Sequence, residues 1–220
     1  MLQPQGFHNG APNTVCKLRK ALYILKQAPR AWFQKLTLTL IQLGFKQARS
    51  DTFLFTFTSK VTSIYILIYV DDIIITNKSP TAIQTLIFTF HRSFPLKDLE
   101  SLHHFLGIEV NSDGAGGIHL SQTKYLKDIL DNLNMSNAKS VKTPMTPSLK
   151  LTNDGTVVCQ DPSLYRSVIG ALQYLTITRL DIAYTINKLC QFMHHPLESH
   201  WKAVKRLLRY LQGTLQHGLH

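Results

Sequence analysis

The sequence is poor in cysteine and has no long apolar run. Its 3 cysteines, Cys16, Cys159 and Cys190, lie far apart and outside any CxxC spacing. Such a set argues against a disulfide framework and against a cysteine zinc site, so a reducing compartment is the default expectation. The longest apolar stretch, residues 64–70, is far shorter than the roughly 20 residues that cross a bilayer. We therefore expect no transmembrane helix and no membrane partner.

Acidic residues are also scarce. The chain has 24 Lys and Arg against 13 Asp and Glu, a net charge of +11. This excess favours a polyanionic partner such as nucleic acid over the competing interpretation, an anionic membrane surface. The first residues, MLQPQGFHNG, have neither the basic start and apolar run of a secretory signal nor the Arg-rich pattern of a mitochondrial presequence. An intracellular location is the default expectation, and the sequence itself does not indicate a compartment.

What is present is a globular composition, with 44% hydrophobic and 17% charged residues in a chain of 220. The spacing of apolar residues predicts a helix over residues 31–43, closed by Gly44 and preceded by a break at Pro29. Ser79 followed by Pro80 predicts the start of another helix, ending near residue 94. Strands are expected in three stretches rich in β-branched and aromatic residues, at 52–58, 61–70 and 73–76.

The second half of the chain predicts a hairpin and then helices. Strands are expected at residues 105–110 and 117–120 around the turn NSDGAG, before a helix capped by Ser121. Residues 137–161 are rich in Thr, Ser, Pro, Lys and Asn, which is typical of a linker. Three polar residues are predicted to start the helices of a small helical subdomain: Asp161, Asp181 and Ser199.

The segment IYILIYVDDIIIT carries the strongest chemical signal. Two β-branched apolar runs flank Asp71 and Asp72, which predicts a hairpin that displays adjacent carboxylates at its turn. Nucleotidyl transfer uses two divalent ions roughly 3.5–4 Å apart, and hard oxygen ligands suit Mg²⁺. Asp71 would be the direct ligand and Asp72 the supporting one. The alternative is an ordinary solvated turn, because Asp is favoured in turns.

Several blocks, in order along nearly the whole chain, resemble the reverse transcriptase region of plant-like, copia-type LTR retrotransposon polyproteins. The blocks are VCKLRKALYILKQAPRAWFQKL, LGFKQARSDTFLF, ILIYVDDIIIT, LKDLESLHHFLGIEV, HLSQTKYLKDIL, KTPMTP, YRSVIGALQYLTITRLDIAYTINKLCQFM and ESHWKAVKRLLRYLQGT. The resemblance implies an RNA-directed DNA polymerase that uses Mg²⁺ and deoxynucleotides and binds an RNA or DNA template–primer. It also implies that Asp71 and Asp72 are the catalytic, metal-binding pair.

The resemblance assigns roles to two further groups. Phe105, Leu106 and Gly107 match the turn that grips the primer strand, for which the alternative is an unremarkable edge strand. A second group matches the segment beneath the incoming nucleotide and template, for which the alternative is a solvated basic segment; it consists of Lys26, Gln27 and Arg30.

The terminal helix is expected to have one basic face and one apolar face. Its cations recur at spacings of i, i+3, i+4 and i+7, at Lys202, Lys205, Arg206 and Arg209. By resemblance to the thumb and connection region, this face would follow nucleic-acid phosphates. Simple solvation of an amphipathic helix is the alternative. The histidine pairs at 103–104 and 194–195 lack companions at metal spacing, and Glu109 is expected to be a surface carboxylate.

The resemblance also predicts the organisation of the chain, of class α+β. A polar tail (1–14) precedes a partial fingers and palm with an antiparallel sheet and packed helices (15–120), a thumb-like helix (121–136), the linker (137–161) and a helical thumb- or connection-like subdomain (162–220). Ribonuclease H is expected to be absent.

Departures from the family predict an inactive product. The family's third catalytic carboxylate lies on a strand upstream of a segment resembling MLQPQGF, where this chain begins. Ile24 stands where the family has Gly, and its side chain is expected to obstruct the nucleotide site; Leu180 replaces a usual Pro. We therefore expect a polymerase fragment that is inactive alone. The alternative is a non-catalytic basic remnant that at most binds nucleic acid.

Overall fold

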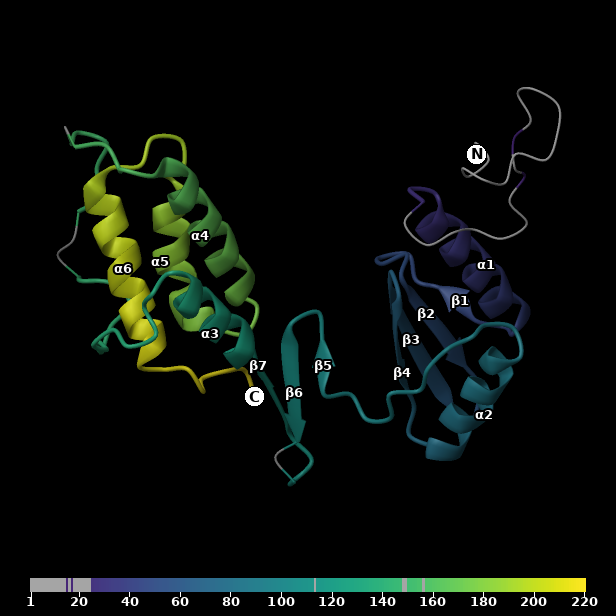
Figure 1. Ribbon diagram of the computed structural model, residues 1–220. Helices are drawn as coiled ribbons and strands as arrows, with labels where there is room; N and C mark the ends of the chain where they lie inside the picture. The colour runs from purple at the N-terminus through teal and green to yellow at the C-terminus, as the bar shows by residue number, and fades with distance from the viewer. Residues whose placement is uncertain (1–14, 16, 18–24, 113, 148–149, 156) are drawn as a thin grey trace, which may run out of the picture. The chain divides into compact units, whose positions relative to one another are not determined.

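The computed structural model describes residues 15, 17, 25–112, 114–147, 150–155 and 157–220 (Figure 1). Ile24 lies outside the described residues. The chain forms two compact units, divided between Glu100 and Ser101, whereas the sequence predicted a palm portion extending to residue 120. Both units combine helices with an antiparallel sheet, so the α+β class is confirmed. None of the helices in the described part of the chain is long and apolar enough to cross a membrane.

The first unit is an antiparallel sheet with strand order β1-β2-β3-β4, covered by two helices. Its elements are α1 (Ala28–Gln42), β1 (Lys46–Gln47), β2 (Leu54–Thr58), β3 (Ser63–Tyr69), β4 (Asp72–Thr76) and α2 (Pro80–His91). The predicted strands at 52–58, 61–70 and 73–76 are confirmed as β2, β3 and β4, each within a few residues of its expected bounds.

The alternation of buried and exposed side chains along β3 shows which face of this sheet is covered. Ile64, Ile66 and Ile68 are buried, whereas Tyr65 and Tyr69 are about half exposed. The three isoleucines form one core with residues of both helices, including Leu36 and Leu40 of α1 and Leu86 and Phe90 of α2. Both helices therefore pack on the isoleucine face. Truncating one such isoleucine to Ala typically costs about 2–5 kcal/mol.

The start of α1 differs from the prediction. Pro29 does not break the helix but lies in its first turn, after the N-cap residue Gln27. The first-turn N–H groups of a helix have no intrahelical partner, so proline is tolerated there. Gly44, with φ of 88°, follows the helix end as predicted. The predicted start of α2 is also confirmed, because the Ser79 side chain accepts a hydrogen bond from the Ala82 N–H at 3.4 Å.

The hairpin between β3 and β4 is confirmed, and its turn has an unusual conformation. Tyr69 pairs with Asp72, which leaves Val70 and Asp71 as a two-residue turn. Val70 has φ of 50°. A β-branched residue rarely adopts this left-handed region, and such outliers cost of order 1–3 kcal/mol. The sheet therefore holds a strained turn.

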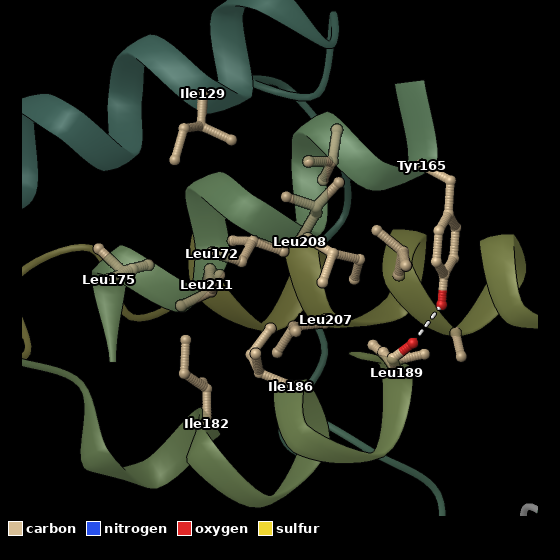
Figure 2. Packing of buried hydrophobic residues seen from close by; sticks show 14 of the residues in the cluster. Ile129, Tyr165, Leu172, Leu175, Ile182, Ile186, Leu189, Leu207, Leu208 and Leu211 are labelled. Atoms are coloured by element: carbon tan, nitrogen blue, oxygen red, sulfur yellow. Dashed lines mark hydrogen bonds between the residues drawn. The ribbon is translucent and has the colours of Figure 1, made fainter. Parts of the chain in front are cut away.

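The second unit has a three-stranded sheet, ordered β5-β6-β7, followed by helices. Its elements are β5 (His104–Phe105), β6 (Ile108–Ser112), β7 (Ile118–Ser121), α3 (Thr123–Asn132), α4 (Pro162–Leu175), the 3-10 helix η1 (Leu180–Ile182), α5 (Ala183–Cys190) and α6 (Glu198–Gln212). The helices share an apolar core (Figure 2), at whose edge the buried Tyr165 hydroxyl donates to the Leu189 carbonyl at 2.8 Å.

Two predictions for this sheet were wrong. Residues 105–110 are not one strand but a tight hairpin between β5 and β6. Ser121 does not cap α3 but ends β7. The cap comes instead from Glu109 on β6, which accepts hydrogen bonds from the Lys124 N–H at 2.7 Å and from the Ser121 hydroxyl at 3.3 Å. Glu109 is therefore half-buried and structural rather than a free surface carboxylate.

Of the predicted helix starts, Asp161 is confirmed, because its side chain accepts the N–H groups at residues 163 and 164. Asp181 instead lies in η1 and forms an ion pair with Arg179, whose side chain is 2% exposed. Burial raises the pKa of Asp181, but hydrogen bonds from Arg179 and Tyr210 outweigh it and hold that pKa below its ordinary value. This network ties η1 to α6.

The predicted linker contains no helix or strand in its described part, yet it packs within the second unit. Residues 139–143, here called the strap, run along α6. Arg209 Nε donates to the Lys139 carbonyl at 2.6 Å, and Arg206 Nη2 donates to the Thr143 hydroxyl at 2.8 Å. Further along, the Cys159 N–H donates to the Pro196 carbonyl at 2.9 Å. The stretch is thus bound to the helices at several of its described residues.

The start of α6 depends on a buried histidine rather than on Ser199. His200 Nδ1 accepts a hydrogen bond from the Leu197 N–H at 3.0 Å. Nε2 lies 3.1 Å from the Thr152 carbonyl, so a neutral ring with its proton on Nε2 satisfies both contacts. Burial, aided by the charge of His195 and opposed by the hydrogen bond to Thr152, lowers the pKa of His200.

Replacing Val70 with Gly should stabilise the first unit. Glycine adopts positive φ without the clash of a Cβ, so Val70→Gly should raise the free energy of unfolding by about 1 kcal/mol in urea titrations. Val61 is a matched control because it is 95% exposed in the β2–β3 turn and is not among the residues with positive φ. Stabilisation by Val61→Gly of the same size would show that strain at Val70 is not the cause.

Acid should weaken the second unit through His200. The folded state holds the pKa of His200 below its ordinary value of 6.5, so the unfolded chain takes up this proton first as the pH falls. The contribution is fully present above about pH 6.5 and is lost below it, by up to about 1.4 kcal/mol per pH unit. Unfolding measured between about pH 7 and pH 5 should show a smaller slope for His200→Gln. The exposed His217→Gln should keep the wild-type slope; equal slopes in all three would refute the assignment.

Candidate functional site

The β3–β4 hairpin places two carboxylates at one end of the first sheet. Asp71 lies in the turn and Asp72 begins β4, opposite Tyr69. Cross-strand partners share a face, so Asp72 lies on the side away from the buried isoleucines. Both aspartates are exposed, and within the described residues neither carboxylate has a hydrogen-bond or ion-pair partner. Their oxygens are free to bind a cation.

These donors fit Mg²⁺ in kind. Mg²⁺ prefers oxygen ligands and is commonly held by one or two carboxylates together with substrate phosphates and water, rather than by a complete protein cage. The described residues contain no group of three or more His, Cys, Asp or Glu side chains arranged to hold a metal. Asp71 and Asp72 therefore form an open site, which needs ligands from elsewhere.

The basic segment predicted beneath the nucleotide lies at the start of α1. Gln27 is the N-cap residue, Lys26 precedes it and Arg30 lies in the first turn; all three are exposed. The first turn has no acidic residue. A cation at the positive end of the helix dipole is unfavourable by about 0.3–1 kcal/mol, and an anion placed there relieves this repulsion. No hydrogen bond within the described residues links these side chains to Asp71 or Asp72.

The predicted primer-grip residues form the turn of the β5–β6 hairpin in the second unit. Phe105 pairs with Ile108, and Leu106 and Gly107 are the two central residues of the turn. Phe105 is half-buried, whereas Leu106 and Gly107 are exposed. The edge-strand alternative is therefore incomplete, because these residues project as a turn. The Tyr174 hydroxyl donates a hydrogen bond to the Leu106 carbonyl.

The basic face of α6 is only partly free. Lys202 and Lys205 are exposed, and the Lys205 ammonium lies 5.6 Å from the centre of the Trp201 ring. Arg206 and Arg209 are half-buried and bind the strap through the hydrogen bonds described above. Two of the four predicted phosphate-binding cations therefore also have a structural role.

Sequence reasoning missed two lysines that this packing brings to α6. Lys139 and Lys142 belong to the strap and are exposed. The composition of their stretch predicts a linker, although residues 133–147 contain two lysines and no acidic residue. That charge pattern was the available signal. Tyr174 and Glu109 were also missed, because their partners lie far away in the sequence.

Comparison with known proteins agrees with the residue pattern. Residues 1–147 match the family described as reverse transcriptase (RNA-dependent DNA polymerase). Over 220 residues the chain is 50% identical to the retrovirus-related Pol polyprotein from transposon RE1 of Arabidopsis thaliana, covering all of this chain and 15% of that protein. It is 46% identical over 220 residues to the corresponding RE2 polyprotein of the same plant, again covering 15% of it.

A more distant relative also matches along almost the whole chain. Over 224 aligned residues the chain is 38% identical to the retrovirus-related Pol polyprotein from transposon TNT 1-94 of Nicotiana tabacum, which covers 97% of this chain and 17% of that protein. The chain thus spans less than a fifth of each of these three relatives. No solved structure matches it. The family match and the identity along the whole chain show that it belongs to the reverse transcriptase family, in the copia-type group of retrotransposon polyproteins.

Proposed function

We propose that these residues supply the metal-binding hairpin and part of the nucleic-acid surface of an RNA-directed DNA polymerase. The substrates would be deoxynucleotides, and the ligand an RNA or DNA template–primer. The proposal is carried by two exposed carboxylates at a strained hairpin turn in a member of the reverse transcriptase family. They belong to Asp71 and Asp72, and neither has a partner among the residues that the structure describes. Strained backbone is concentrated at functional sites, where neighbouring structure maintains it.

The hairpin residues would act by placing negative charge where cations are needed. Asp71, in the turn, would be the direct ligand, and Asp72, fixed by its pairing with Tyr69, would support it. When bound, Mg²⁺ would stabilise charge on the attacking 3′ hydroxyl and on the leaving pyrophosphate. At the start of α1, Lys26, Gln27 and Arg30 would bind nucleotide or template phosphates, which relieves the unfavourable charge there.

The second unit would hold the duplex. Phe105, Leu106 and Gly107 project as a turn suited to contact the primer backbone. Lys202 and Lys205 of α6, joined by Lys139 and Lys142 of the strap, would bind phosphates, while Arg206 and Arg209 would mainly fix the strap. Contacts of this kind are electrostatic and carry no sequence information.

Catalysis would need a further carboxylate. Asp71 and Asp72 are adjacent on one turn, whereas a two-ion site clamps attacking and leaving oxygens from more than one side. We therefore propose that residues 1–220 alone bind a primed template without extending it. The competing function is nucleic-acid binding with no link to catalysis. The two functions predict different results when a third carboxylate is supplied, because only a polymerase fragment would then extend the primer.

The extension assay separates these functions. The 220-residue chain should give no Mg²⁺-dependent primer extension on a primed RNA template. Fusing it to the upstream segment of the RE1 polyprotein should give little activity, and adding Ile24→Gly should give measurable extension. Asp71→Asn in that fusion should abolish it, whereas Asp128→Asn, at an exposed position on α3, should not. If the unfused chain extends the primer and Asp71→Asn abolishes that extension, the proposed need for a further carboxylate is overturned. If no fusion extends the primer, the competing function is favoured.

Binding should be weak, independent of sequence and sensitive to salt. With about four phosphate contacts, affinity for a duplex should fall about 100-fold between about 50 mM and 200 mM salt. Lys202→Gln should reduce the slope of log affinity against log salt by about 1. Lys60→Gln removes another exposed lysine, in the β2–β3 turn, to which no phosphate contact is assigned, and should leave the slope unchanged. An affinity that does not change with salt would contradict the proposal.

A further inference from the structure

The turn between β5 and β6 has a backbone conformation that its sequence does not favour. Leu106 has φ of 50° and Gly107 has φ of 75°. Two positive φ values are the pattern of the type I′ hairpin turn, which prefers Asn or Gly at both central positions. Gly107 meets that preference, but Leu106 does not. Contacts outside the turn must therefore help to hold it.

Tyr174 of α4 supplies those contacts. Its hydroxyl donates a hydrogen bond to the Leu106 carbonyl. Its ring also lies against the next residue, because a Cβ built on Gly107 would be 3.8 Å from Tyr174 Cε1. One side chain thus bonds to Leu106 and lies beside Gly107.

Tyr174 is itself held in place by the helices. Its ring meets the Tyr125 ring edge-on, with centroids 5.4 Å apart and an interplanar angle of 84°. The Tyr125 hydroxyl donates to the Ala171 carbonyl of α4 at 3.3 Å. On the same helix Leu172 and Leu175 are buried in the apolar core shown in Figure 2. The core therefore fixes Tyr174, and Tyr174 fixes the turn.

The outer side of the turn is open to a ligand. Leu106 and Gly107 are exposed, and within the described part of the chain their backbone N–H groups form no hydrogen bond. Backbone N–H groups are common ligands of nucleic-acid phosphates and set the register of the bound strand. Holding these two donors in one arrangement lowers the ordering cost of binding.

We propose that Tyr174 is a positioning residue, which holds the turn at residues 105–107 in the conformation that contacts a phosphate near the 3′ end of the primer. This inference rests on the primer contact assigned to that turn under the proposed function. Tyr174 does not touch the nucleic acid; it acts through Leu106.

The test uses the 220-residue chain and a DNA primer, annealed to an RNA template, that carries a photoreactive thionucleotide at its 3′ end. Cross-linked peptides are mapped at a duplex concentration that saturates each protein. The wild-type chain should cross-link at residues 105–107. Tyr174→Phe removes only the hydroxyl and should lower that yield about fivefold, the factor expected for one lost hydrogen bond. Unchanged yield would overturn the inference and leave the primer contact standing.

Two matched variants separate positioning from general packing. Tyr125→Phe removes the neighbouring hydroxyl, which bonds to Ala171 and not to the turn, so the yield should not change. In a Leu106→Gly background the turn no longer needs support, so adding Tyr174→Phe should have no effect. The same fivefold loss in that background would overturn the inference. Absence of any wild-type cross-link at 105–107 would instead refute the primer contact, and the inference with it.

Discussion

The register of the β3–β4 hairpin decides where the two carboxylates lie. Ile66 and Ile68 face the helices, and their partners across the hairpin, Ile75 and Ile73, lie on the same face. If β3 slipped by one residue, its isoleucines would move to the open face of the sheet. Leu67 and Tyr69 would then take their place against the helices. Because two fully buried isoleucines oppose that slip, Tyr69 pairs with Asp72 and the turn falls on Val70 and Asp71.

The same constraint explains how strain can persist in the turn. Four non-glycine residues have positive φ: Val70, Glu100, Leu106 and Asn134, among the described residues. Two of them lie in the two-residue hairpin turns to which the family resemblance assigns the metal pair and the primer contact. Each turn is held by packing beyond itself, the first by the sheet core and the second by Tyr174. A turn with relaxed backbone would have more conformations to lose on binding a ligand.

Local signals in the sequence were sufficient for much of the fold. Ser79 with Pro80 and Asp161 with Pro162 marked helix starts correctly, because a cap and a first-turn proline act within a few residues. The hairpin at Asp71 was also predictable, since β-branched runs define strands locally. The family resemblance then supplied roles that periodicity alone does not contain.

Features that depend on distant partners were not predictable in this way. Glu109 caps α3 from strand β6, the strap binds α6 across more than 60 residues, and the Leu106 carbonyl accepts a hydrogen bond from a tyrosine on α4. The strap looked like a linker because it has the polar composition of one, and composition does not report hydrogen bonds to a helix. Ser121 looked like a cap because it is a favoured cap residue, but pairing within β7 takes it into the sheet.

The distribution of charge favours a polyanionic ligand. Among the described residues, Arg179 and Asp181 form the one ion pair, and it is partly buried and joins η1 to α6 through Tyr210. The other cations in the described part of the chain have no carboxylate within ion-pair distance, in a chain whose net charge is +11. No acidic residue follows Glu198. Beyond the first turn of α6, which contains Glu198, every charged residue of α6 and the strap is a cation, so the field over this region is positive. It is screened over about 8–10 Å at physiological salt. A polyanion whose phosphates reach that distance gains from the field, whereas a neutral partner does not.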